Sequence, residues 1–311
     1  MIGKKQVESE NYKIPFLYYN RARDAMADIV GRYYRQGYQK IYLPGYIGWS
    51  PKEGSGIFDP LNAIVGLERH YYRMTKKLHI DVEKLQRSLQ RHSIVLLVNY
   101  FGFRDLRIDE IIEMVHRNDC VVIEDNAHGF FTYFCKGATQ ADATFFSLHK
   151  MFPFNTGGGL IVRDRDFEGL TGLKKANGAN PFIYDYNGIA RKRVENYKLL
   201  LNLLVDQGKY FVPLRAKSEL IDSIPQTFPI LIRRGNRDKI YEIMNELGFG
   251  VVSLYHTLIS ELRNVEHEDA LWLSQRIMNL PVHQDCDSNL YEKMVELLVD
   301  ACEETEKAKV S

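Results

Sequence analysis

The chain has few cysteines, almost no net charge and no long apolar run, and each absence excludes a class of protein. The spacing of its four cysteines (Cys120, Cys135, Cys286, Cys302) fits neither a disulfide framework nor a metal site. The net charge of +1 gives no electrostatic reason to expect nucleic acid or an anionic membrane as a partner. Residues 1–6 lack the apolar region of a signal peptide, and no run approaches the roughly 20 apolar residues of a membrane span. We therefore expect a cytoplasmic protein without a metal.

Continuous apolar runs alternate with amphipathic segments in the first half of the chain. Residues 94–100, apart from Asn99, and residues 120–123 form apolar runs, and residues 108–116 between them carry Ile and Val at helical spacing. Continuous apolar strands joined by a helix are typical of a parallel sheet that is covered on both faces. Residues 143–146 and 160–162 predict two more strands. The sequence therefore predicts an α/β fold with a mainly parallel sheet flanked by helices.

The other predicted elements complete this picture and suggest two domains. The expected helices span residues 20–37 (with Asn20 as N-cap), 81–89, 189–204, 239–247, 271–277 and 291–301, and the expected further strands span 41–43, 228–232 and 251–254. We expect a large α/β domain at 1–185, and a linking helix with a small α+β domain at 186–311.

One lysine follows a predicted strand in an unusual setting. Ser147 and Lys150 lie between the apolar run 143–146 and a glycine triplet, and Asp125 ends the strand at 120–123. Ligands in such sheets gather beyond the carboxyl ends of the strands, so we expect these side chains to meet. Pyridoxal phosphate (PLP) needs an amine for its Schiff base, an anion for its ring nitrogen and donors for its phosphate. Lys150 or Asp125 alone is more typical of a solvated surface. The two together predict a PLP site with Lys150 as the Schiff-base residue.

Other residues are expected to hold the same cofactor. The Ser147 hydroxyl and the backbone at Ala22 and Arg23, near a helix N-terminus, would bind the phosphate, and Arg23 would add charge. His128 would hydrogen-bond the ring hydroxyl or pack beside the ring.

Three further positions leave alternatives open. Tyr46 and Trp49 are candidates for the wall beside the cofactor ring, with simple core packing as the alternative for each. His283 follows an apolar turn and either lines a substrate pocket or lies on the surface.

Several segments resemble one enzyme family, the DegT/StrS group of fold-type-I, PLP-dependent sugar aminotransferases. The segments are 20–25, 43–46, 99–102, 124–128, 146–150 with the glycines at 157–159, and 280–283. Residues 124–128, Glu-Asp-Asn-Ala-His, resemble the family's most specific motif. The chain is expected to be an unusually short member.

The resemblance implies a homodimer with active sites at the subunit interface. It implies transfer of an amino group, usually from glutamate, to a keto sugar carried on a nucleotide, in polysaccharide or deoxysugar biosynthesis. Lys150 takes the place of the lysine that forms the internal aldimine and shuttles the proton, and Asn187 takes the place of a residue that reaches the partner's phosphate.

Departures from the family pattern keep other functions open. Lys150 follows Ser147 by three residues, as in aspartate aminotransferases, whereas many family members have a gap of five. Some relatives replace the lysine by histidine and act as sugar dehydratases, and His149 stands beside Lys150. The alternatives are therefore a PLP-dependent dehydratase or lyase, and a non-catalytic relative that binds a sugar nucleotide or a partner protein.

Overall fold

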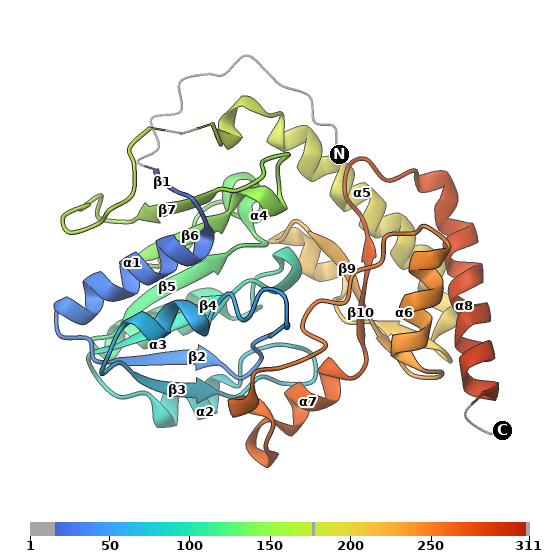
Figure 1. The fold of residues 1–311 in the computed structure, drawn as a ribbon, viewed down its shortest axis with the longest axis horizontal. Helices are drawn as coiled ribbons and strands as arrows, with labels where there is room; N and C mark the ends of the chain where they lie inside the picture. Colours follow the sequence, from blue (N-terminus) through green and yellow to red (C-terminus); the bar gives the residue numbers. More distant parts are fainter. Residues whose placement is uncertain (1–15, 176–177, 309–311) are drawn as a thin grey trace.

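The computed structural model describes residues 16–175 and 178–308. The expectation drawn from residues 1–6 lies outside this range. A large sheet with its helices occupies one side of the molecule and a smaller sheet the other, as Figure 1 shows.

Strands and helices alternate through most of the chain. The strands are β1 (Leu17–Tyr19), β2 (Lys40–Pro44), β3 (Glu68–Tyr72), β4 (Ser93–Val98), β5 (Val121–Asn126), β6 (Ala143–Ser147), β7 (Gly158–Val162), β8 (Phe211–Pro213), β9 (Thr227–Ile232) and β10 (Ile277–Pro281). The α-helices are α1 (Ala22–Arg35), α2 (Val82–Ser88), α3 (Ile108–Arg117), α4 (Phe130–Lys136), α5 (Tyr186–Leu204), α6 (Arg237–Glu246), α7 (Glu268–Ser274) and α8 (Tyr291–Lys307).

The large sheet is mainly parallel, as predicted. Its strand order is β1-β7-β6-β5-β4-β2-β3, and the strands from β3 to β6 run parallel to one another. β7 pairs antiparallel with β6, and β1 pairs antiparallel with β7. The carboxyl ends of β2, β4, β5 and β6 therefore meet at one edge of the sheet.

Burial explains why these segments fold as they do. Every residue of β6 is buried, and so is nearly all of β4, which accounts for their unalternating apolar sequences. α3 buries Ile108, Ile111, Ile112 and Val115 along one stripe and packs against β5. α2 begins at Asp81, whose side chain accepts a hydrogen bond from the Lys84 backbone N–H.

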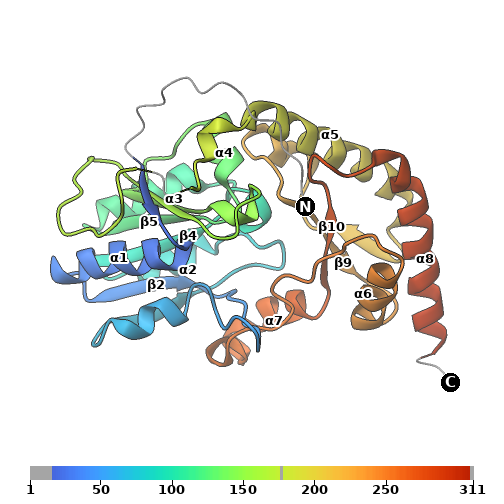
Figure 2. The same ribbon diagram turned by 45° about the horizontal axis from the view of Figure 1, so that its top comes forward.

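The smaller sheet is antiparallel, with the order β10-β9-β8. α6 and α8 pack against each other beside it, and α5 contacts α8, β8 and β9. In Figure 2, α5 runs along the top of the molecule from the large sheet toward α8. The Asp185 side chain caps α5, so the expected border between 1–185 and 186–311 falls at the start of this helix. Buried apolar residues of both parts form one contiguous cluster, and the division into two domains stays a prediction.

Three sequence predictions differ from the structure. α1 begins at Ala22, with Arg21 rather than Asn20 as its N-cap. The expected strand at 251–254 is reduced to one bridge between Val252 and Asn279, because the preceding Gly248 and Gly250 have positive φ and turn the chain. The expected helix at 271–277 ends at Ser274, and the apolar residues after it form β10, since a short apolar run fits a helix and a strand equally well. No helix within residues 16–175 and 178–308 has the length and apolar character needed to cross a membrane.

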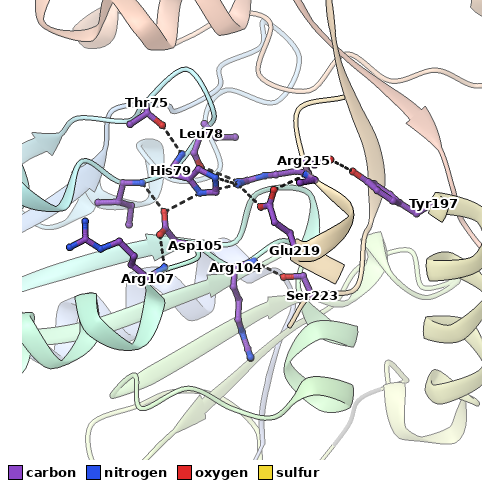
Figure 3. A network of polar contacts seen from close by, with 12 residues as sticks. Thr75, Leu78, His79, Arg104, Asp105, Arg107, Tyr197, Arg215, Glu219 and Ser223 are labelled. Atoms are coloured by element: carbon purple, nitrogen blue, oxygen red, sulfur yellow. Dashed lines mark hydrogen bonds and ion pairs between the residues drawn. The ribbon is translucent and has the colours of Figure 1, made fainter. Parts of the chain in front are cut away.

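A buried ionic cluster connects a segment next to the smaller sheet with a turn next to the large sheet (Figure 3). We call Arg215, Glu219, His79 and Asp105 the Arg215 cluster. Arg215 Nη1 donates to Glu219 Oε2 at 3.0 Å and lies 3.1 Å from His79 Nδ1, while Nη2 donates to the Leu78 carbonyl at 3.0 Å. Asp105 Oδ2 accepts the Ile80 N–H at 2.7 Å and lies 3.6 Å from His79 Nδ1. These contacts tie the segment after β8 to the turn after β3.

Candidate active site

The loops after the parallel strands surround a cleft of about 780 Å³. Its lining comes from the start of α1, the segment 47–57 after β2, the ends of β5 and β6, and the segment 253–256. The volume is typical of a small-molecule site. Among the described residues no group of three or more His, Cys, Asp or Glu side chains is placed to hold a metal ion.

Lys150 lies on the one-turn helix η3 (Leu148–Lys150), directly after β6, and lines the cleft. Its Nζ lies 3.1 Å from His128 Nε2. The side chain is open to the cleft, but the amine itself lies deep among protein atoms. This loss of surrounding water lowers the pKa of the Lys150 amine, although the Asp125 and Glu53 carboxylates act in the opposite direction. A lowered pKa makes a lysine a better nucleophile at neutral pH.

Asp125 lies near the end of β5 and forms part of the cleft wall. The side chain is 5% exposed, and burial raises the pKa of its carboxyl to about 6, against the lowering effects of the Ala127 N–H and of Lys150. Asp125 Oδ1 accepts that N–H at 2.8 Å. A buried carboxylate of this kind is suited to a protonated ring nitrogen, which would supply the opposite charge.

A second group of polar atoms gathers where α1 meets β6. Ala22, Arg23 and Ser147 all line the cleft. The first N–H groups of a helix have no partner within the helix, and Arg21 makes no side-chain cap, so these N–H groups are suited to an anion. Gly158, opposite Ser147 in β7, permits this approach: a Cβ there would lie 2.4 Å from the carbonyl atoms of Arg21.

The two aromatic candidates for the wall beside the cofactor ring, Tyr46 and Trp49, lie in different environments. Trp49 lines the cleft and is 41% exposed, whereas Tyr46 is fully buried below it, packed edge-on against Tyr100. The reason is local: residues 47–49 pair with residues 257–259 as an extended segment. Side chains alternate in such a segment, so positions three apart face opposite sides. Tyr46 is therefore a core residue, and Trp49 remains the candidate wall.

The other two candidates lie away from the cleft lining. His283, in the loop after β10, pairs with Asp285 at 4.0 Å, and its carbonyl accepts from Asn196 on α5. This loop belongs to the smaller sheet, which explains its distance from the strand ends of the large one. Asn187, in the first turn of α5, accepts a hydrogen bond from the Cys135 thiol at 3.4 Å. Its expected role toward a partner subunit stays a prediction.

The cleft also contains residues that the sequence did not single out. They are Glu53, Phe145 and Tyr255, among others. Phe145 is predictable as the inward position of a strand end beside Asp125, with which it pairs in the sheet. Glu53 and Tyr255 belong to loops that only tertiary structure brings to the strand ends, so the sequence carries no signal for them.

Comparisons with known proteins agree with this architecture. Residues 71–169 match the model of the DegT/DnrJ/EryC1/StrS aminotransferase family, and this range includes Asp125, His128, Ser147 and Lys150. No curated protein sequence matches the chain.

Solved structures match over nearly the whole chain. A structure described as a sugar aminotransferase of Streptococcus pneumoniae, in its PMP form, has a TM-score of 0.73 at 14% identity and covers 95% of this chain and 88% of its own. GDP-4-keto-6-deoxy-D-mannose-3-dehydratase of E. coli, with bound hydrated PLP, has a TM-score of 0.71 at 16% identity, covering 92% and 87%. PseC of Helicobacter pylori, an aminotransferase in the biosynthesis of pseudoaminic acid, has a TM-score of 0.68 at 16% identity, covering 93% and 87%. Identities this low show a shared fold.

The expected resemblance is thus confirmed: the chain has the fold-type-I architecture of these enzymes, and over residues 71–169 it carries the sequence pattern of the DegT/DnrJ/EryC1/StrS aminotransferase family.

Proposed function

We propose that this chain is a PLP-dependent aminotransferase that transfers an amino group, from glutamate, to a nucleotide-linked keto sugar. One observation carries the proposal: the Lys150 amine, the Asp125 carboxylate and the Ser147 hydroxyl line the same cleft at the strand ends. The three groups supply the amine, the ring-nitrogen partner and a phosphate donor that PLP requires. The matching family of aminotransferases and the PLP- or PMP-bound structural relatives support the same cofactor.

The residues of the cleft fit this cofactor in size and charge. Ser147, the first N–H groups of α1 and the Arg23 guanidinium would hold the phosphate. Asp125 would keep the ring nitrogen protonated, and a protonated ring acts as an electron sink for the substrate carbon. Trp49 would cover one side of the ring.

Lys150 would move the proton in the reaction. An amine with a lowered pKa is a better nucleophile toward a carbonyl carbon and gives up its proton more readily. With the cofactor bound, the Lys150 amine would carry a proton to and from the substrate carbon. The pKa of Asp125, about 6, leaves its carboxylate ionised at neutral pH, as the pairing with a cationic ring requires.

The charge of the cleft supports anionic substrates. Its lining includes Arg21, Arg23 and Lys52 besides Lys150, against the carboxylates of Asp125 and Glu53. Glutamate and a nucleotide-linked sugar both carry negative charge, which such a lining attracts. We further propose a cytoplasmic homodimer, in which Asn187 reaches the partner's site, and a division of the chain at residue 185.

A PLP-dependent sugar dehydratase is the second candidate. His149 lines the cleft beside Lys150, and its Nδ1 lies 3.3 Å from Ser147 Oγ, so an imidazole is also available for proton transfer. One structural relative is a dehydratase.

The reaction with glutamate tests the proposed amino donor, and the sugar product separates the two candidates. The protein is loaded with PLP and mixed with glutamate while its absorbance is followed. An aminotransferase loses the long-wavelength band of the bound cofactor and accumulates the pyridoxamine form, with one 2-oxoglutarate per site. A stable PLP spectrum with glutamate would contradict the proposed donor. If every amino acid tested also left the spectrum unchanged, transamination would be ruled out. If glutamate reacts, a nucleotide-linked keto sugar is added: a product sugar that has gained nitrogen indicates the aminotransferase, and a deoxy sugar without added nitrogen indicates the dehydratase.

A further inference from the structure

His128 has a hydrogen-bonding partner at each nitrogen of its ring. Nε2 lies 3.1 Å from Lys150 Nζ, and Nδ1 lies 3.3 Å from the backbone nitrogen of Phe101. The residue is only 4% exposed. The Tyr255 ring packs against it edge-on, with the ring centroids 6.1 Å apart. The imidazole therefore sits in a fixed position between the end of β4 and the lysine.

The amide of Phe101 is presented by an unusual backbone. Phe101 has a φ of 59°, in the left-handed region that non-glycine residues seldom adopt. Such a conformation is strained and persists where the surrounding structure fixes it. Here the Phe101 carbonyl accepts the Gln226 N–H at 2.7 Å. Gly102 follows with a φ of 89°, and a Cβ there would lie 2.3 Å from the Ile224 carbonyl oxygen. The strained turn is thus held where its N–H faces His128.

The directions of these hydrogen bonds determine the tautomer of His128. A backbone N–H can only donate, so Nδ1 must carry a lone pair. The proton of the neutral ring then lies on Nε2, which donates toward Lys150. An ammonium group on Lys150 would place two donors 3.1 Å apart, whereas an uncharged amine presents its lone pair.

The charged groups around Lys150 favour opposite states of its amine. Asp125 from β5 and Glu53 from the segment 47–57 favour the ammonium form, while burial and Arg23 from α1 oppose it. His149, next in the chain, has its pKa lowered by burial and by Lys150, so it is neutral at neutral pH. Burial by itself acts to hold the pKa of His128 below its usual range, which leaves its ring neutral as well.

We propose that the Phe101 amide and His128 form a relay that holds Lys150 as an uncharged amine in the cofactor-free chain, ready to attack a carbonyl group. His128 is then a positioning residue, which acts through Lys150. The identity of the carbonyl compound rests on the proposed function, whereas the protonation states of His128 and Lys150 are measured without any cofactor.

Nuclear magnetic resonance reports the tautomer directly. The full chain is prepared with ¹⁵N-labelled histidine, freed of carbonyl compounds with hydroxylamine, and studied from about pH 6 to about pH 9, across the range where free histidine titrates. The His128 signals are assigned by their loss in His128→Gln. The relay predicts a neutral ring with its proton on Nε2 at every pH. A proton on Nδ1, or titration to imidazolium within this range, would overturn it.

Competitive labelling measures the amine. Trace acetic anhydride is added to the same cofactor-free protein at a series of pH values, and peptides with Lys150 and with the exposed Lys77 are quantified by mass spectrometry. Model lysines titrate near pH 10.4. We expect the labelling of Lys150 to reach its plateau at lower pH than that of Lys77. Equal pH profiles for the two lysines would contradict an uncharged Lys150.

Two substitutions test whether His128 is responsible. His128→Asn keeps an acceptor for the Phe101 amide but is too short to reach Lys150, and it should reduce labelling of Lys150 about tenfold near neutral pH, the equivalent of one pKa unit. His128→Gln keeps an N–H donor near the Nε2 position and should restore the wild-type profile. Should neither variant fold, the wild-type tautomer and labelling profile still decide the question. Failure to bind PLP with both profiles as predicted would count against the proposed function alone.

Discussion

Two clusters of buried charge in this protein differ in how many hydrogen bonds their carboxylates accept. In the Arg215 cluster, the guanidinium meets the Glu219 carboxylate and a backbone carbonyl, and the other oxygen of Glu219 accepts the Ala216 N–H at 2.8 Å. In the cleft, the Asp125 carboxylate accepts one backbone N–H and otherwise borders a cavity of about 780 Å³.

The difference explains the direction of the pKa shifts. Burial acts to raise the pKa of Asp105 in the Arg215 cluster, but hydrogen bonds from His79 and two backbone N–H groups bring it below its usual value. Burial also raises the pKa of Asp125, and there the opposing contacts are too few, so it reaches about 6. A buried carboxylate that accepts enough hydrogen bonds to oppose the effect of burial, as Asp105 does, stays ionised within the fold, whereas one that accepts few beside a cavity is suited to a ligand of opposite charge.

The largest expected effect follows from removal of the cleft amine. Lys150→Met should slow the reaction of the PLP-loaded protein with glutamate by about 10²–10⁴-fold or more, because both the nucleophile and the proton carrier are lost. The rate is read from the cofactor absorbance. The exposed Lys77→Met is the matched control and should react like the wild type. A Lys150→Met variant with the full rate would refute the mechanism.

Substitutions in the Arg215 cluster should change the free energy of unfolding instead. Arg215→Met leaves Glu219 buried without its cation and should lower the free energy of unfolding by about 3–5 kcal/mol. The double variant Arg215→Met/Glu219→Leu should recover most of this loss, since no unpaired charge remains. Urea unfolding measures both. If the double variant were as unstable as the single one, the cluster would owe its effect to packing rather than to charge pairing.

Substitution of Asp125 should raise, rather than lower, the free energy of unfolding, and the size of the effect should depend on pH. Its pKa of about 6 in the fold lies above the value of about 3.9 for an unfolded chain, so the folded state holds the proton more tightly. Ionisation therefore costs stability above about pH 6, and the cost disappears below about pH 4. Asp125→Asn should raise the free energy of unfolding of the cofactor-free protein by up to about 2–3 kcal/mol near pH 8 and leave it unchanged near pH 4. An Asp125→Asn variant that is less stable than the wild type at pH 8 would contradict the view that the Asp125 charge is uncompensated in the cofactor-free fold.

The smallest effect is expected at the phosphate end of the cleft. Ser147→Ala removes one hydrogen bond to a charged group and should weaken PLP binding about 10- to 30-fold, since the N–H groups of α1 remain. Equilibrium titration followed by cofactor fluorescence measures the affinity, with the exposed Ser260→Ala as control. Unchanged binding in Ser147→Ala would remove Ser147 from the phosphate site.

The sequence predicted the parallel sheet and the groups at its strand ends because both depend on local patterns. Continuous apolar runs marked β4, β5 and β6, and Asp125, Ser147 and Lys150 lie at or just after the ends of β5 and β6. Tyr46 and Trp49 were indistinguishable in sequence, because only the pairing of 47–49 with 257–259 decides which one faces the cleft. The left-handed turn at Phe101 was equally invisible, since its conformation is imposed by Gln226 and Gly102 in the folded chain.

The most direct test of the central claim is borohydride reduction of the protein with PLP, followed by peptide mapping. The account predicts a long-wavelength absorbance band before reduction and a single reduced cofactor fixed on Lys150 afterwards. A protein that gives no band and no adduct, or an adduct on another lysine, would show that the cleft of Lys150 and Asp125 is not the site of PLP chemistry.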